Sequence, residues 1–521
     1  MDAKQLKSLL RPEAYPEPAE DVRLLQTHVS WIFLAGEFVY KIKKPVDFGF
    51  LNFSTLDRRL FYCHEEVRLN SRLCPELYLG VVPLREAPGG VSFRGSGTVV
   101  DHAVKMKRLP AERMADRLLV SGQLSGGDVA AIAARIAEFH RTAERGGEID
   151  AYGSVAAIAR NWEENFQQTE AFAGITLSRA DLRLMRRWVD SFMKENAGLF
   201  DARVAGGFIR ACDGDIHLEN ICLSDTICIF DCIEFNNRFR YTDTAADIAF
   251  LLMDLEYHGR RDLAEVCLGE YCKASADDGM LPLIGFYSLY RAFVRGKVES
   301  FRLRDPAIPA EERSGAGERA KRYFRLARGY LLRENLSPAL VVLGGLSGSG
   351  KSTIAAELAM ELGLEFLSSD RIRKELAGIP AGERGSDGYG EGLYSGAMNE
   401  ATYREIFARG ERLLAAGRGA IVDATCRRRE ERQALRRLAD AHGAVLYPFL
   451  VECPEKTVRQ RLGERERLGT GVSDAGWQVY LRQREEFEPV LESETGWQTL
   501  DGSAPLNRSV DRILSVMGLL H

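Results

Sequence analysis

Short apolar runs alternate with helical patterns along the C-terminal third of the chain. Residues 339–343, 365–370, 419–425 and 444–452 are apolar enough, and short enough, to be strands. Each run is separated from the next by a longer segment with the spacing of a helix. This alternation predicts an α/β fold, a doubly wound parallel sheet with helices on both faces.

The first 335 residues show a different pattern. Residues 27–43 predict an antiparallel hairpin with its turn at 35–37, and a helix is expected at about 55–73. Beyond Ser125 the pattern is mostly helical. The other predicted strands are short and lie at 77–83, 102–107, 208–212 and 226–231. A small β-rich lobe before a larger helical lobe indicates an α+β, two-lobed protein-kinase-like domain.

The chain of 521 residues is too long for one ordinary core, so two or three domains are expected from its length. A turn-rich connection begins after Arg302 and is followed by a charged helix, expected at 318–332. We place the boundary after this helix, which gives domains at 1–335 and 336–521.

Composition is ordinary for a globular protein, with 45% hydrophobic and 28% charged residues. A net charge of −5 argues against stable wrapping of nucleic acid. Apolar runs are too short to cross a membrane and the N-terminus lacks a signal core, so we expect a cytoplasmic protein without a membrane partner. The ten cysteines form no C-x-x-C pair, which predicts reduced, mostly buried thiols; packing is favoured over metal binding for Cys228 and Cys232.

Residues Gly345 to Ser352 read Gly-Leu-Ser-Gly-Ser-Gly-Lys-Ser and match G-x-x-x-x-G-K-[ST] throughout. A predicted strand precedes them and a helical pattern follows, which disfavours a turn that binds nothing. Backbone N–H groups of such a loop converge on phosphates, Lys351 can bridge the β- and γ-phosphates, and Ser352 can hold Mg²⁺. The predicted cofactors are ATP, with GTP as the alternative, and Mg²⁺. The predicted contacts are Gly345, Ser347, Gly348, Ser349, Gly350, Lys351, Ser352 and Thr353.

A second group of polar residues has a spacing suited to phosphoryl transfer. Asp215 is followed by Asn220 and then by Asp231, which ends an apolar strand. A carboxylate can orient an attacking hydroxyl, and carboxylate and amide oxygens can hold Mg²⁺. Ordinary turn and cap residues are the alternative interpretation.

The segment Asp213-Gly-Asp-Ile-His-Leu-Glu-Asn220 resembles the H-G-D-x-H-x-x-N catalytic loop of the aminoglycoside phosphotransferase and choline kinase family. The resemblance implies that Asp215 is the catalytic base and that Asn220 and Asp231 hold Mg²⁺. His217 would organise the loop. Asp213 stands where the family has its first histidine. The family's D-x-x-x-D-x-A segment is matched by residues 243–249, which we interpret as structural.

The same resemblance assigns a phosphate-binding lysine to the predicted hairpin. Lys41 is the candidate, and Lys43, on the same strand face, is the alternative. Glu66 would be its ion-pair partner on the following helix, with Glu65 next in line. No G-x-G-x-x-G loop precedes Lys41, so the turn near Gly36 would cover the phosphates.

Asp370 and Arg373 follow the second strand of the P-loop domain and share one helix face. A capping Asp with a solvated Arg is the alternative. The domain resembles the group of P-loop kinases that contains polynucleotide 5′-kinase, zeta toxin and chloramphenicol phosphotransferase. The resemblance implies that Asp370 is the general base, that Arg373 binds an anionic substrate group, and that Asp423 orients the substrate or the arginine.

An arginine-rich helix at 459–467, followed by a flexible segment at 469–474, is expected to form a lid over this site. Arg461 and Arg465 are spaced so that both can reach one set of phosphates. A charged helix facing solvent is the alternative.

Together these features predict a bifunctional ATP-dependent phosphotransferase. Its C-terminal domain would phosphorylate a hydroxyl of a nucleotide, a nucleic-acid 5′ end or a small molecule, and its N-terminal domain a small hydroxylated substrate. The joined halves resemble a bacterial family of fusion kinases. One alternative is a nucleotide-gated regulatory protein with an N-terminal pseudokinase; another is an RNA-repair or toxin-like kinase.

Overall fold

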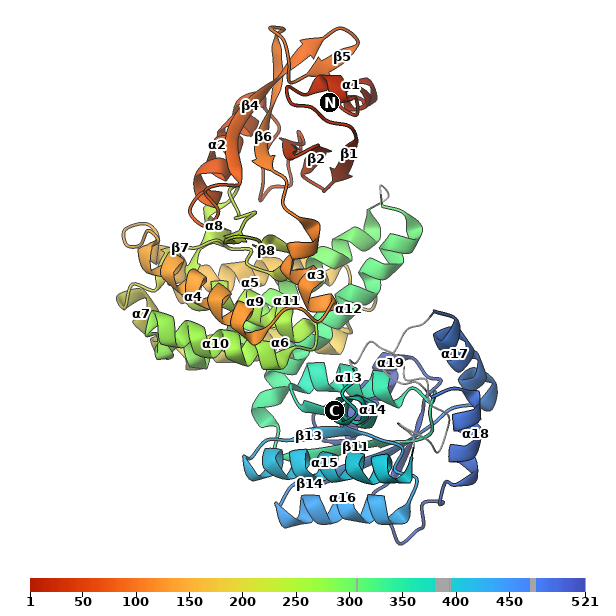
Figure 1. Ribbon diagram of the computed structural model, residues 1–521. Helices are drawn as coiled ribbons and strands as arrows, with labels where there is room; N and C mark the ends of the chain where they lie inside the picture. Colours follow the sequence, from red (N-terminus) through yellow and green to blue (C-terminus); the bar gives the residue numbers. More distant parts are fainter. Residues whose placement is uncertain (306–307, 380–392, 394, 469–474, 521) are drawn as a thin grey trace. The chain divides into compact units, whose positions relative to one another are not determined.

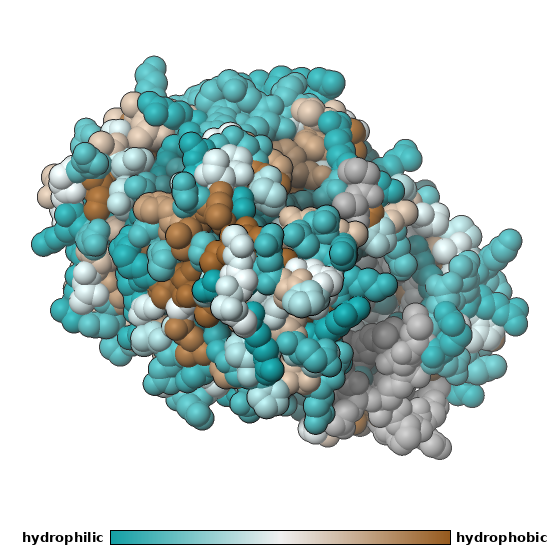
Figure 2. Space-filling model, turned by 90° about the horizontal axis from the view of Figure 1, so that it is seen from above, coloured by the Kyte–Doolittle hydropathy of each residue, from teal (hydrophilic) through white to brown (hydrophobic). Residues whose placement is uncertain are grey.

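A computed structural model describes residues 1–305, 308–379, 393, 395–468 and 475–520 (Figure 1). The chain forms two compact units, Met1–Ala327 and Arg328–His521. The division falls inside helix α12 (Ala310–Leu332). Within the described residues, no helix is both long and apolar enough to cross a membrane. On the face shown in Figure 2, hydrophilic residues cover most of the surface and hydrophobic residues gather in a limited area.

A six-stranded antiparallel sheet with the order β1-β2-β3-β6-β4-β5 opens the first unit. The predicted hairpin is confirmed, since β2 and β3 pair antiparallel around the turn at Gly36. The strands are β1 Val22–Gln26, β2 Ser30–Ala35, β3 Phe38–Lys43, β4 Tyr78–Ala87, β5 Gly90–Ser92 and β6 Val99–Lys107.

Strand β3 presents two chemically different faces. Tyr40 and Ile42 are buried in a core that also contains Leu9 and Tyr15, next to helix α1 (Ala3–Ser8). Lys41 and Lys43 alternate with them and contact Glu66 of helix α2 (Leu56–Asn70). The Thr55 side chain caps α2 by accepting a hydrogen bond from the Arg58 N–H. The alternation therefore brings two lysines to one helix.

The rest of the first unit is mostly helical, as predicted. Two small antiparallel sheets, β7–β10 and β8–β9, interrupt the helices. The helices are α3 Ala115–Val120, α4 Gly126–Thr142, α5 Val155–Glu170, α6 Arg179–Glu195, α7 Ala197–Ala205, α8 Asn237–Arg240, α9 Thr244–Tyr257, α10 Arg261–Ser275 and α11 Leu281–Arg304. The strands are β7 Ile209–Ala211, β8 Ile221–Leu223, β9 Ile227–Ile229 and β10 Tyr241–Asp243.

The turn-rich connection predicted after Arg302 is wrong for most of its length. Helix α12 already begins at Ala310 and continues through Gly315 and Gly317. Its small residues pack closely, since Ala316 and Ala320 are fully buried. Burial of this face outweighs the poor helix propensity of glycine.

The second unit contains a five-stranded parallel sheet with the order β12-β13-β11-β14-β15. The predicted doubly wound α/β fold is confirmed. Strand β15 was not predicted, because it has one buried residue and no apolar run. The strands are β11 Ala339–Gly344, β12 Glu365–Ser368, β13 Ala420–Asp423, β14 Val445–Glu452 and β15 Gln498–Asp501.

Helices cover the parallel sheet in pairs. Helix α13 packs against α19, and α15 packs against α16 (Figure 1). The helices are α13 Lys351–Leu362, α14 Ser369–Leu376, α15 Gly396–Ala415, α16 Arg429–Ala441, α17 Glu455–Leu468, α18 Trp477–Glu485 and α19 Leu506–Val516. The carboxyl ends of the strands meet the start of α13, which is where ligands bind in such sheets.

The prediction of reduced cysteines is wrong for one pair. Cys74 and Cys228 form a disulfide with a Cα–Cα distance of 4.9 Å. The two residues lie 154 positions apart, so no local sequence pattern indicates that they pair. The other cysteines are free, and most of them are buried. Cys232 contacts Arg72 and the carbonyl of Asp213, which is a packing role.

Candidate active sites

The glycine-rich loop between β11 and α13 requires its glycines. Gly345 has φ +140°, and an added Cβ would lie 2.5 Å from the Val451 carbonyl oxygen. Gly348 has φ +80°, and its Cβ would lie 2.9 Å from Val458. Both positions exclude a side chain by backbone conformation and by space. The loop leads directly into the N-terminus of α13, and the dipole of that helix favours binding of phosphate.

A cavity of about 450 Å³ lies against this loop, within the size range of small-ligand sites. It brings together predicted residues from three separate segments. Its lining includes Ser347, Gly348, Gly350, Lys351, Ser352, Thr353, Asp370, Arg461 and Arg465. Gly345 and Ser349 line a neighbouring cavity instead.

Asp423 ends strand β13 beneath the loop and is 2% exposed. Burial raises the pKa of Asp423, while Lys351 and the Ser352 hydroxyl act in the opposite direction. Among the described residues, the Asp423 Oδ1 atom has no hydrogen-bond partner. The Ser352 hydroxyl and the unsatisfied carboxylate oxygen of Asp423 are oxygen ligands of the kind that Mg²⁺ prefers.

Asp370 and Arg373 lie in the first turns of α14 and form an ion pair. Arg373 also donates from an Nη atom to Asn399 Oδ1 at 3.2 Å. The Asp370 side chain is 23% exposed and lines the cavity beside Lys351. Asp370 can therefore reach a hydroxyl close to bound phosphate. Asn399, which lies in the next helix, α15, was not predicted, because no motif contains it.

Arg461 and Arg465 of α17 both line the cavity. The Arg461 guanidinium donates to the carbonyl oxygens of Ser349 at 3.2 Å and Gly502 at 2.9 Å. Arg465 donates to the Ala475 carbonyl. These backbone contacts connect α17 to the loop and to the segment after β15. The predicted lid segment at 469–474 lies outside the described residues.

The N-terminal candidate site is organised by helix α9. Both Asp247 carboxylate oxygens accept backbone hydrogen bonds, from the N–H of Asp213 at 3.0 Å and of Gly214 at 2.8 Å. Asp254 accepts from the Leu218 N–H at 2.9 Å. The helix therefore fixes both ends of the segment that contains Asp215, in the structural role expected for Asp247.

Asp215 lies between two polar neighbours. Asn220 donates from Nδ2 to the Asp215 carbonyl at 3.1 Å and to Oδ2 at 3.3 Å. His217 Nε2 lies 3.6 Å from Asp215 Oδ2. Burial alone would raise the pKa of Asp215, but His217, Arg295 and Arg291 hold it below its usual value. Asp215 is therefore a carboxylate at neutral pH.

Asp231 follows β9 in the left-handed region, with φ +65°. Such a conformation is strained for a residue other than glycine, and neighbouring hydrogen bonds hold it. Phe230 donates its N–H to the Asn220 carbonyl at 3.0 Å, and Ile233 donates to the Asp213 carbonyl at 3.2 Å. The Asp231 segment is thus bonded to both ends of the loop that contains Asp215.

Lys41 and Lys43 both contact the fully buried Glu66. Lys41 Nζ lies 2.9 Å from Glu66 Oε1 and 2.5 Å from Asp231 Oδ1. Lys43 Nζ lies 2.6 Å from Glu66 Oε2 and also pairs with Glu234. Burial would raise the pKa of Glu66, but the two lysines outweigh it and lower that pKa to about 2. Glu234 was not predicted, although it follows Asp231 by only three residues.

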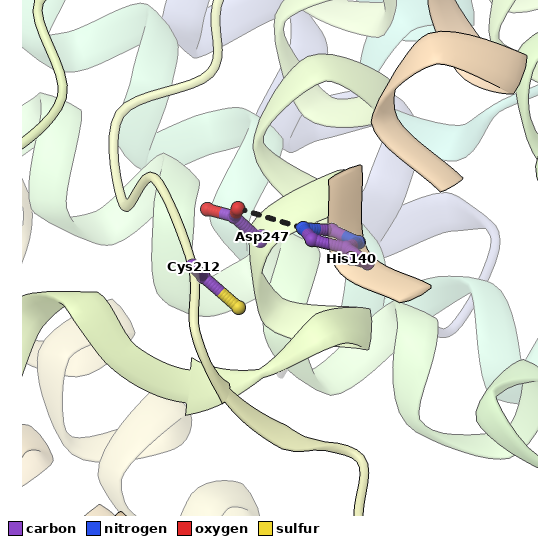
Figure 3. A group of neighbouring side chains, drawn as sticks. All are labelled: His140, Cys212 and Asp247. Carbon is purple, nitrogen blue, oxygen red and sulfur yellow. Dashed lines mark hydrogen bonds and ion pairs between the residues drawn. The ribbon is translucent and has the colours of Figure 1, made fainter. Parts of the chain in front are cut away.

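A buried group of His140, Cys212 and Asp247 has ligand-type side chains within 4.8 Å of one another (Figure 3). These side chains already have partners within the protein. His140 bonds Asp247 Oδ2 at 2.9 Å and the Tyr271 hydroxyl at 2.7 Å. Burial raises the pKa of the Cys212 thiol well above its usual value, so it stays protonated at neutral pH. This group supports Asp247 beneath the loop that contains Asp215.

Comparison with known proteins finds a relative that matches nearly the whole length of the chain. It is 35% identical over 508 residues to the uncharacterized protein Rv2004c of Mycobacterium tuberculosis, and the match covers 96% of each chain. The chain belongs to the family of that protein.

Other matches concern the second unit. Residues 340–490 match a family described as AAA domain. A shikimate kinase of Salinibacter ruber is 31% identical over 191 residues, which are 34% of this chain and 85% of that protein. The match to a gluconokinase structure from Sinorhizobium meliloti covers 35% of this chain and 91% of the gluconokinase chain, with 24% identity and a TM-score of 0.25. The match to an APS kinase structure from Mycobacterium tuberculosis covers 35% of this chain and 97% of the APS kinase chain, with 19% identity and a TM-score of 0.24.

The phosphate-binding loop, the parallel sheet and the shikimate kinase match agree. The protein is an ATP-dependent kinase of the P-loop type, as the sequence predicted.

Proposed function

We propose that this protein is a bifunctional phosphotransferase with one active site in each unit. The C-terminal site transfers the terminal phosphoryl group of ATP to a hydroxyl of a small molecule. The observation that carries this half is that Asp370 and Lys351 line one cavity. Phosphoryl transfer needs a cation on the phosphates and a carboxylate at the attacking oxygen, and the cavity offers both.

The acceptor of this site carries an anionic group. Arg373 is held beside Asp370 by its ion pair and by Asn399, so its guanidinium lies next to the proposed base, where it can bind an anionic group of the acceptor. The similarity to a shikimate kinase favours a small hydroxylated acid over a nucleic-acid end. Ser352 and Asp423 are the residues that would hold Mg²⁺, which supplies charge neutralisation on the phosphates.

The N-terminal site is a second, kinase-like phosphotransferase for a small hydroxylated substrate. In it Lys41 binds nucleotide phosphates, Asp215 accepts the acceptor proton, and Asn220 and Asp231 hold Mg²⁺. The ionised state of Asp215 and the Lys41–Glu66 ion pair support this proposal over an N-terminal pseudokinase.

The test is an ATP-consumption screen of the full chain against sugars, hydroxy acids, nucleosides, oligonucleotide 5′ ends and aminoglycosides. Asp370→Asn and Asp215→Asn variants assign each activity to a site. We expect each variant to abolish transfer to a different acceptor. Acceptor-dependent consumption that survives in the Asp370→Asn/Asp215→Asn double variant would overturn the proposal.

A further inference from the structure

The two lysines of β3 differ sharply in their surroundings. The Lys43 side chain is 1% exposed and Glu66 is fully buried, whereas Lys41 is 13% exposed and its partner Asp231 is 45% exposed. Exposure therefore rises from Lys43 outward to Asp231. A phosphate arriving from solvent can reach Lys41 without displacing the buried carboxylates.

Lys43 is enclosed by carboxylates and an aromatic ring. Its Nζ contacts Glu66 on α2 and Glu234 after β9, and lies 4.8 Å from the centre of the Phe53 ring. Glu234 is 8% exposed. A buried ammonium needs such compensation, because an unpaired charge in this environment is strongly destabilising.

Glu234 also belongs to the short segment that contains Asp231. The two residues are separated by Cys232 and Ile233, whose backbone N–H groups donate to Asn70 Oδ1 at 2.8 Å and to the Asp213 carbonyl at 3.2 Å. The Lys43–Glu234 pair adds a direct link from this segment to β3. With both ends attached, Asp231 keeps its left-handed conformation beside Lys41.

We propose that Lys43 and Glu234 are a positioning pair that holds Glu66 and the Asp231 segment in place, so that Lys41 alone binds the nucleotide phosphates. This inference rests on the proposed N-terminal function. It assigns a role to Glu234 and separates the roles of two lysines that the sequence leaves equivalent. Neither member of the pair touches the nucleotide.

Loss of Glu234 leaves Lys43 with Glu66 as its single carboxylate partner among the described residues. Lys43 then competes with Lys41 for Glu66, and the Asp231 segment loses its link to β3. Both changes disturb the phosphate site without removing any group that contacts phosphate. Loss of residues that position metal ligands typically lowers metal affinity or activity by about ten- to hundredfold, and we expect an effect of that size on nucleotide binding here.

The experiment uses the full chain with Lys351→Ala, which removes nucleotide binding at the P-loop site. Binding of an N-methylanthraniloyl derivative of ATP is titrated with and without Mg²⁺. The variants are Glu234→Gln, Lys43→Met, and Lys43→Met/Glu234→Leu. The last replaces the buried pair by apolar side chains of similar size, which often preserves stability.

The matched control is Lys105→Met/Glu17→Leu. Lys105 lies on β6 opposite Tyr40, contacts the rings of Phe38 and Tyr40, and pairs with Glu17. This pair belongs to the same sheet but to the face opposite Lys41. Its removal tests the general effect of losing a lysine–carboxylate pair.

We expect the three pair variants to weaken nucleotide binding by about ten- to hundredfold, while the control variant binds as the parent does. The apolar double variant is expected to keep the parent melting temperature and still bind weakly, which a purely structural role does not produce. Unchanged affinity in the apolar double variant, or equal weakening in the control, overturns the inference and leaves the N-terminal site standing. No binding in the Lys351→Ala parent overturns the N-terminal function itself.

Discussion

The two nucleotide sites proposed here hold phosphate in different ways. The C-terminal site uses backbone N–H groups of one contiguous segment, Gly345 to Ser352, whose glycines leave no room for side chains. The proposed N-terminal site would use side chains from distant segments, namely Lys41, Glu66, Asp215 and Asp231. A backbone site can be recognised from one contiguous sequence motif, whereas the residues of a side-chain site come together only when the chain folds.

The largest expected effects come from removing the proposed base of each site. Asp370→Asn and Asp215→Asn should each lower kcat for its own acceptor by about 10³-fold, because the attacking hydroxyl loses its proton acceptor. Nucleotide affinity should change little. Steady-state kinetics with each acceptor measures both effects, and each variant is the control for the other. A loss of both activities in either variant would contradict two independent sites.

The next effect concerns the lysine of the N-terminal site. Lys41→Met, in the Lys351→Ala background, should weaken ATP binding by about 10²-fold, because the phosphates lose their charged partner. Equilibrium titration with a fluorescent ATP derivative measures it. An effect smaller than that of Lys43→Met would reverse the assignment of the two lysines.

A backbone site should fail when its glycines change. Gly345→Ala places a Cβ 2.5 Å from the Val451 carbonyl oxygen at φ +140°. It should lower the free energy of unfolding of the second unit by about 1–3 kcal/mol and weaken nucleotide binding at the loop. Gly463→Ala is the control, since its Cβ meets open space within the described residues of the same unit. Denaturant unfolding followed by circular dichroism compares them; equal stability of the two variants would show that the loop tolerates side chains.

The smallest effect depends on pH and concerns the residue that departs from the H-G-D-x-H-x-x-N pattern. Burial, and then Asp247, raise the pKa of Asp213 to about 8. The folded chain therefore keeps a proton that the unfolded chain releases near a pKa of about 3.9, and stability is lost as pH rises through this range to about 8.

Asp213→Asn removes this ionisation. Its melting temperature should exceed that of the parent by roughly 2–5 °C at pH 8.5, with a smaller increase at pH 5. Thermal unfolding at the two pH values checks the difference. An equal increase at both would mean that ionisation of Asp213 is not its source.

The sequence predicted what local patterns can encode. The β2–β3 hairpin follows from alternating side chains, and the phosphate-binding loop follows from a contiguous motif. Asp215 and Asn220 were found together because they share one short loop. The Lys43–Glu234 pair and the Cys74–Cys228 disulfide join residues more than 150 positions apart, and such contacts leave no local signal. The early start of α12 was missed because Gly315 and Gly317 suggest a turn, whereas in the structure they lie within the helix, next to the buried Ala316.

Each unit of the chain is expected to hold its own nucleotide. Isothermal titration of the full chain with a non-hydrolysable ATP analogue and Mg²⁺ counts the sites directly. We expect two sites per chain in the parent, one after Lys351→Ala, and one with affinity weakened by about 10²-fold after Lys351→Ala with Lys41→Met. One site in the parent and none after Lys351→Ala would contradict the account.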